Sequence, residues 1–244
     1  GYGKLGIDSL QELVTTPVQL TFYKDSKDSG NLADAPALPF KDIVKIASGD
    51  NHTLAVDDDG HIYAWGDNTF GQLSRTVDQE KPYELMPVQV IFPDLAEDEW
   101  IVNISAGEYH ALALTNKGRL YAWGRNDTNQ LGLHLTWGYQ TEPQYLATPA
   151  VVKLSETADS SDDYFVVKMV AGIGHSVALT KSGRVYTWGS NSQGQLGTGL
   201  AYDSTNKNVV TTTRNTPAQV IFRNDKGEPM DVTILTLAAG LESG

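Results

Sequence analysis

Cysteine is absent from the 244-residue sequence, and its absence removes three kinds of chemistry at once. The chain can form no disulfide, no thiolate metal site and no cysteine nucleophile. A chain with an adequate apolar core needs no covalent cross-link in either a reducing or an oxidising compartment. The absence therefore restricts the chemistry of the protein and leaves its compartment open.

Long apolar runs and an excess of positive charge are also missing. No run approaches the roughly 20 residues that a membrane-spanning helix requires, so we expect no membrane insertion. The formal net charge of -12 repels phosphate backbones, so nucleic acid is not an expected partner. Hydrophobic residues still make up 40% of the chain, which is enough to build a packed core.

Recognisable catalytic motifs are lacking as well. The sequence contains no Gly-rich phosphate loop, no nucleophile elbow and no recurring pair of carboxylates. We therefore predict no catalytic residue, no metal site and no cofactor. Acidic clusters at 57–59, 97–99 and 159–163 lack the spacing of an EF-hand loop, and we interpret them as solvated surface.

What the sequence does contain is an internal repeat. Three segments align without gaps at a Gly-x-x-His motif, a Trp-Gly pair 13 positions after the histidine, and a Gln-Leu pair. The recurring glycine, histidine and tryptophan are Gly49, His52 and Trp65; Gly107, His110 and Trp123; and Gly172, His175 and Trp188. Such agreement across three copies indicates a repeat architecture.

Each repeat predicts four short strands. The stretch between histidine and tryptophan predicts a hairpin, with Gly60, Gly118 or Gly183 supplying the positive φ of a tight turn. Two further strand-like runs follow each hairpin; they begin at Pro87 and Ile101, Pro149 and Val166, and Pro217 and Val232, and a related run begins at Pro17. Four-stranded antiparallel units in series predict an all-β fold, an arc of a β-propeller.

The Gly-x-x-His, Trp-Gly and Gly-Gln-Leu-Gly pattern resembles the regulator of chromosome condensation repeat. The resemblance implies a closed ring of about seven blades, so we interpret residues 1–244 as a single propeller fragment of about four units. The expected units are 1–48 (partial), 49–106, 107–171, 172–239 and the truncated start of another at 240–244. On this interpretation the natural polypeptide is longer, and its remaining blades are partners of this arc.

The recurring residues have a structural interpretation. We expect each repeat histidine to lie at a strand start and to hydrogen-bond neighbouring backbone, because one histidine per blade does not converge on a metal. Each repeat tryptophan should pack between adjacent blades. Trp100 and Trp137 have no evident counterpart in the other repeats, so the repeat does not explain them.

Candidate partner-binding residues lie in one class of connection, between the Gln-Leu motif and the Pro-led strand. In a meander this connection opens on the opposite face from the one that follows the Pro-led strand. Its aromatic residues are of the kind that anchors protein interfaces or stacks on sugars; they are Tyr83, Trp137, Tyr139, Tyr145 and Tyr202. The alternative, that these rings fold back over the blade edges, stays open.

The function that we predict is a non-enzymatic protein–protein interaction scaffold, with the identity of its partner open. The resemblance also permits a guanine nucleotide exchange factor for a small GTPase, because the best-known family member has this activity. An enzyme-inhibiting propeller and a carbohydrate-binding propeller are further alternatives. Fold alone does not discriminate among these classes.

Overall fold

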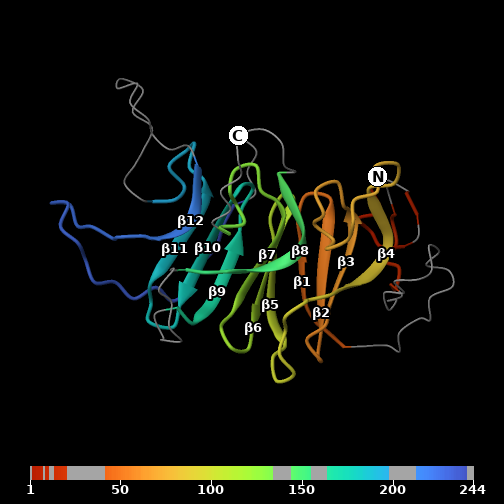
Figure 1. The fold of residues 1–244 in the computed structure, drawn as a ribbon, viewed down its shortest axis with the longest axis horizontal. Coiled ribbons are helices and arrows are strands. Elements are labelled where there is room, and N and C mark those ends of the chain that lie inside the picture. Colours follow the sequence, from red (N-terminus) through yellow and green to blue (C-terminus); the bar gives the residue numbers. More distant parts are fainter. Residues whose placement is uncertain are drawn as a thin grey trace.

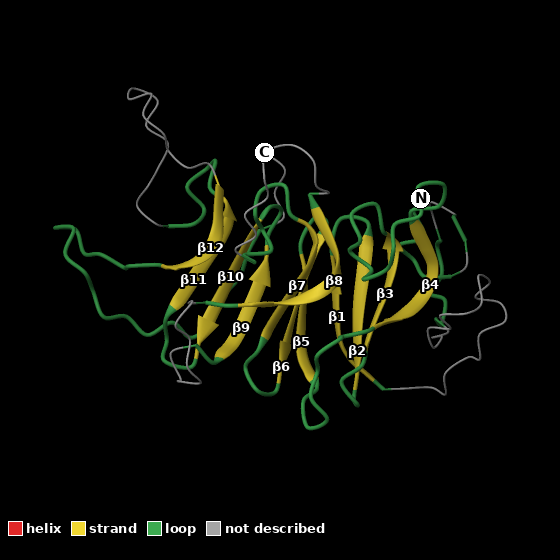
Figure 2. Cartoon of the chain, viewed as in Figure 1, coloured by secondary structure: helices red, strands yellow, loops and turns green. Residues whose placement is uncertain are grey.

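The computed structural model describes residues 2–7, 9–10, 14–20, 42–133, 144–154, 164–197 and 213–240. Within them the chain is all-β, with twelve strands in three antiparallel sheets and no helix (Figure 2). The first sheet holds β1 (Ile43–Ser48), β2 (His52–Asp57), β3 (Ile62–Asp67) and β4 (Tyr83–Val90); the second holds β5 (Ile101–Ala106), β6 (His110–Thr115), β7 (Leu120–Arg125) and β8 (Tyr145–Val152); the third holds β9 (Val166–Ala171), β10 (His175–Thr180), β11 (Val185–Ser190) and β12 (Thr213–Gln219).

Each sheet is a four-stranded meander, which we call the first, second and third blade in chain order. The blades follow one another across the molecule (Figure 1), and β1, β5 and β9 lie next to one another. The predicted hairpins join the second and third strands of each blade, and Gly60, Gly118 and Gly183 have positive φ values of 81°, 75° and 84°. The arc of four-stranded blades predicted from the repeat is confirmed.

The blades are offset by one strand from the sequence repeat. The last strand of the unit 49–106 is β5, which pairs with β6 and belongs to the next blade. The Gly-x-x-His motif therefore forms the turn between the first and second strands of a blade. The chain instead passes from one blade to the next in the longer connection after the fourth strand. This connection leads from the outer edge strand of one sheet to the inner edge strand of the next.

The Pro-led strands begin earlier than their prolines suggested, at Tyr83, Tyr145 and Thr213. The ladder passes a register shift opposite the Trp-Gly pair and continues beyond it. The runs expected at Pro17 and Val232 form no strand. A strand requires ladder partners, and residues 17–20 and 232–240 pair with no strand of the described chain, although Leu235 accepts a hydrogen bond from the Lys168 side chain of β9.

The core lies between blades as much as within them. All six residues of β2, β3 and β6 are buried, because each of these central strands is covered on both faces. One apolar cluster joins Leu54 and Ile62 of the first blade to Trp123 of the second, and another joins Leu112 of the second to Trp188 of the third. Blade packing and blade formation are therefore coupled.

Candidate functional site

The meander sends its connections to two opposite faces. We call upper face the side that carries the turns at 49–51, 107–109 and 172–174 together with the connections between the third and fourth strands. The lower face carries the hairpin turns and the connections from one blade to the next. Both faces can be followed in Figure 1, with the upper face at the top.

Two of the candidate partner-binding aromatics lie on the upper face. Tyr83 and Tyr145 are the first residues of β4 and β8, where they pair with Asp67 and Arg125. Both side chains are half-buried, so they rest against the blade and do not stand at a loop tip. Trp137, Tyr139 and Tyr202 lie outside the described residues.

The repeat glycine and histidine form the contact between blades at this face. A Cβ on Gly107 would lie 2.5 Å from the carbonyl oxygen of Gly172 in the next blade and 2.3 Å from the ring of His110. A Cβ on Gly49 would likewise collide with the carbonyl oxygen of Gly107 and with the ring of His52. Glycine is required because the backbones of neighbouring blades and the histidine ring leave no room for a side chain.

The rings of His52 and His110 are buried and that of His175 is half-buried, and these rings differ in their partners. The Nε2 of His110 lies 3.0 Å from the hydroxyl of Ser176 in the next blade, which donates in turn to the carbonyl of Gln130 at 2.8 Å. Both ring nitrogens of His52 lack a hydrogen-bond partner. Burial lowers the pKa of His52 to about 4 and that of His110 to about 3, and it lowers the pKa of the less buried His175. The expected bonds from His52 and His110 to backbone are therefore not formed.

The repeat tryptophans bridge blades through their indole nitrogens. Trp123 Nε1 donates to the carbonyl of Gln72 at 2.9 Å, and Trp188 Nε1 donates to that of Gln130 at 2.8 Å. Trp65 makes the same bond to Lys4, at the position that aligns with these glutamines. The Trp-Gly and Gln-Leu motifs are thus partners across the blade interface.

An aromatic and cationic cluster fills the upper side of the first blade interface. Phe70 of the first blade packs edge-on against Tyr109 of the second, with ring centroids 5.2 Å apart. The Arg125 guanidinium lies over both rings, at 5.0 Å and 5.5 Å, and pairs with Asp127 at 2.5 Å and Glu108 at 3.8 Å. This cluster was not predicted from the sequence, because none of its three residues recurs at the equivalent position of another repeat.

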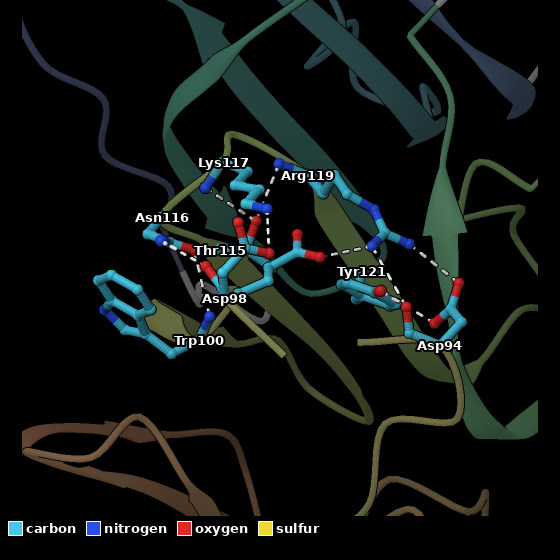
Figure 3. Close-up of polar contacts among 9 residues, drawn as sticks. Asp94, Asp98, Trp100, Thr115, Asn116, Lys117, Arg119 and Tyr121 are labelled. Atoms are coloured by element: carbon cyan, nitrogen blue, oxygen red, sulfur yellow. Dashed lines mark hydrogen bonds and ion pairs between the residues drawn. The ribbon is translucent and has the colours of Figure 1, made fainter. Parts of the chain in front are cut away.

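The lower face carries a polar network that ties the connection at 91–100 to the second blade (Figure 3). Arg119 donates to Glu99 at 2.6 Å and to Asp94 at 2.9 Å, and the Tyr121 hydroxyl donates to Asp94 at 2.9 Å. Lys117 pairs with Asp98 beside it. These contacts hold the connection at 91–100 against the second blade, so we assign them a structural role.

Two acidic residues contradict the interpretation of the acidic clusters as solvated surface. Asp57 has a fully buried carboxylate that accepts hydrogen bonds from the His61 ring and the Tyr63 hydroxyl. Glu99 is buried against Arg119. Each carboxylate accepts hydrogen bonds from neighbouring side chains, which offset the cost of its burial, although Glu99 Oε1 has no hydrogen-bond partner.

Trp100 has a structural counterpart after all. Its side chain contacts the hairpin-turn glycine Gly60 of the preceding blade, and Phe165 covers Gly118 in the same way at the next interface. The pair was missed because the aligned residues are of different types. The Trp100 side chain is nevertheless 48% exposed on the lower face.

The described ranges contain neither a metal-binding cluster nor a membrane-spanning helix. No group of three or more His, Asp or Glu side chains converges there as a metal site would require. The same part of the chain contains no helix that is long and apolar enough to cross a bilayer.

These features define a class: repeat proteins whose four-stranded sheets pack side by side as blades of a β-propeller. The regulator of chromosome condensation (RCC1) repeat matches residues 59–114, 117–179 and 182–240. The chain belongs to this family.

Relatives agree with this assignment. Protein RCC1 of Candida albicans is 34% identical over 204 residues, which are 80% of this chain and 39% of the relative. Protein pim1 of Schizosaccharomyces pombe is 31% identical over 169 residues, 66% of this chain and 30% of the relative. The solved structure of Prp20p from Saccharomyces cerevisiae matches with a TM-score of 0.59 at 24% identity, covering 79% of this chain and 41% of that one. The chain thus spans less than half of the relatives it matches.

Proposed function

We propose that this chain is a non-enzymatic scaffold that binds a protein partner through its upper face. The observation that carries the proposal is the contrast between the two faces. On the lower face, Lys117 and Arg119 of the second blade pair with acidic residues of the connection at 91–100. The upper face instead presents half-buried tyrosines and a cavity between blades.

The chemistry of the upper face supports this choice. Tyr83 and Tyr145 combine an apolar ring with a polar hydroxyl, which suits the centre of a protein interface. Prp20p has been studied for its binding to Gsp1p and histones, so partners of this fold are proteins in at least one relative. Exchange activity on a small GTPase is a second candidate because of the similarity to protein RCC1 of Candida albicans, and a nucleotide-release assay tests it.

We also propose that further blades of the same polypeptide cover the outer face of β1. Ile46 in β1 is 67% exposed, whereas its equivalents Ile104 and Met169 are 7% and 3% exposed. The difference has a simple cause, because β5 and β9 each have a preceding blade against which they pack. A blade placed before the first would bury Ile46 in the same way.

Affinity capture with matched variants tests the partner face. The double substitution Tyr83→Ser and Tyr145→Ser alters the upper face, and Trp100→Ser removes a half-exposed aromatic from the lower face. We expect the upper-face variant to lose a protein that the original chain and the Trp100→Ser control both retain. Thermal unfolding of all three verifies folding. Equal capture by the three, or loss by the control alone, would contradict the proposal.

A further inference from the structure

A cavity opens on the upper face between the second and third blades. Its volume is about 700 Å³. Glu108, Arg125 and Asp127 line it from the second blade, and Gly174, Ser190 and Gln195 line it from the third. Charged and polar side chains thus reach the cavity from both blades, which makes the cavity a property of their packing.

The repeat explains why this interface is hollow. At the first interface the equivalent space is filled by Phe70, Tyr109 and Arg125, which stack on one another. The aligned residues at the second interface are Thr128, Gly174 and Ser190. Three large side chains are thus replaced by three small ones, while the backbone framework of the interface is kept.

Negative charge surrounds the hollow. Glu108 and Asp127 stand on its wall with a single cation, Arg125, between them. Burial raises the pKa of Glu108, Arg125 opposes this rise, and the charges of Asp50 and Asp127 add to it. The His175 ring on the opposite wall has a lowered pKa and adds no positive charge at neutral pH. An additional cation would relieve this imbalance.

We propose that the cavity receives an arginine side chain from the protein partner. The inference rests on the proposed function and gives the upper face a specific subsite. A guanidinium presents five donors in a plane, which suits carboxylate and amide oxygens such as those of Glu108 and Gln195. The neighbouring interface supplies the precedent, because Arg125 occupies the position that Ser190 leaves open.

A short peptide tests the proposal without knowledge of the partner. The probe is an acetylated and amidated pentapeptide with one arginine between glycines, and its control carries citrulline, which keeps the shape and removes the charge. Calorimetric titration at low ionic strength should show binding about tenfold tighter for the arginine peptide. Equal affinity for both peptides, or no binding of either, would overturn the proposal.

A variant of this chain with a filled cavity tests the same proposal from the side of the protein. The triple variant Thr128→Phe, Gly174→Tyr and Ser190→Arg transplants the residues of the first interface, and the φ of Gly174 lies outside the left-handed region that favours glycine. We expect it to bind the arginine peptide at least about tenfold more weakly, with Trp100→Ser on the lower face as the unaffected control. Should the triple variant fail to fold, Glu108→Gln replaces it, with an expected loss of about fivefold. Unchanged affinity in the variant used would contradict the assignment.

The outcomes separate this inference from the function on which it rests. If the upper-face tyrosines are needed for partner capture but the arginine and citrulline peptides do not differ, the arginine subsite is wrong and the partner face stands. If capture does not depend on the upper face at all, the proposed function fails, whatever the peptide does.

Discussion

At the level of residues, one hydroxyl decides whether the repeat histidine has a side-chain partner across the blade interface. Ser176 links the His110 ring to the carbonyl of Gln130, whereas the aligned residue at the first interface is Ala111. The Nε2 of His52 consequently has no hydrogen-bond partner, whereas the Nδ1 atoms of His52 and His110 are both without one. A buried group in this state lowers the free energy of unfolding by about 1–3 kcal/mol relative to a bonded one.

Restoring the hydroxyl should stabilise the protein. Ala111→Ser adds a group that can accept from His52 and donate to the carbonyl of Gln72, so we expect the free energy of unfolding to rise by about 1 kcal/mol. The reciprocal change Ser176→Ala should lower it by about 1–2 kcal/mol. Urea denaturation of both variants measures the two values. A decrease in both would show that the serine makes no comparable bridge at the first interface.

Acid should destabilise the protein through the same histidines. The pKa values of His52 and His110 are lowered to about 4 and about 3, so the unfolded chain binds protons below pH 6.5 while the folded rings stay neutral. Stability is therefore full above pH 6.5 and is lost as the pH falls toward 4, by on the order of 1 kcal/mol per pH unit for each ring.

Thermal unfolding between pH 7 and pH 4 measures this loss. The matched variant His110→Gln keeps a polar side chain that does not titrate, and its unfolding temperature should fall less steeply over the same interval. A slope equal to that of the unaltered protein would exclude His110 as a source of acid sensitivity.

At the level of strands, burial is decided by the neighbouring blade. Ile46, Ile104 and Met169 occupy the same position in β1, β5 and β9, yet Ile46 is largely exposed and the other two are buried. All three residues are apolar, although only Ile104 and Met169 are buried in this chain. Equivalent positions of the repeat thus share an apolar residue but differ in their exposure to solvent.

Alanine substitution at these positions should lower the free energy of unfolding by different amounts in β1 and β5. Ile104→Ala removes a side chain from the core between the first and second blades, and we expect a loss of about 2–5 kcal/mol. Ile46→Ala should cost well under about 1 kcal/mol in this chain, because little apolar surface is withdrawn from water at that position. Comparison of the two denaturation midpoints tests the difference. Equal losses would mean that β1 is covered as β5 is.

The hairpins could be predicted from sequence because their signals are local. The alternation of apolar residues and the turn glycines Gly60, Gly118 and Gly183 lie within a dozen positions. The offset of the blades from the repeat could not be predicted in this way, since it depends on whether β5 pairs with β6 or with β4. Strand pairing across a long connection leaves no periodic signal in either partner.

For the whole molecule, the division into two faces follows from the meander and could be derived from the repeat. The side-chain contacts on each face could not be derived from the repeat. Asp57 is buried because His61 and Tyr63 are placed against it, and Phe70 meets Arg125 only across an interface between blades. Asp57, Phe70 and Arg125 have residues of other types at the equivalent positions of the other repeats, so the repeat carries no signal for these contacts.

Hydrogen exchange with and without the captured partner tests the central claim, that the upper face is the partner surface. We predict slower exchange of the turns at 107–109 and 172–174 in the complex, with the lower-face turns at 58–60 and 116–118 unchanged. Protection confined to the lower-face turns would contradict the account.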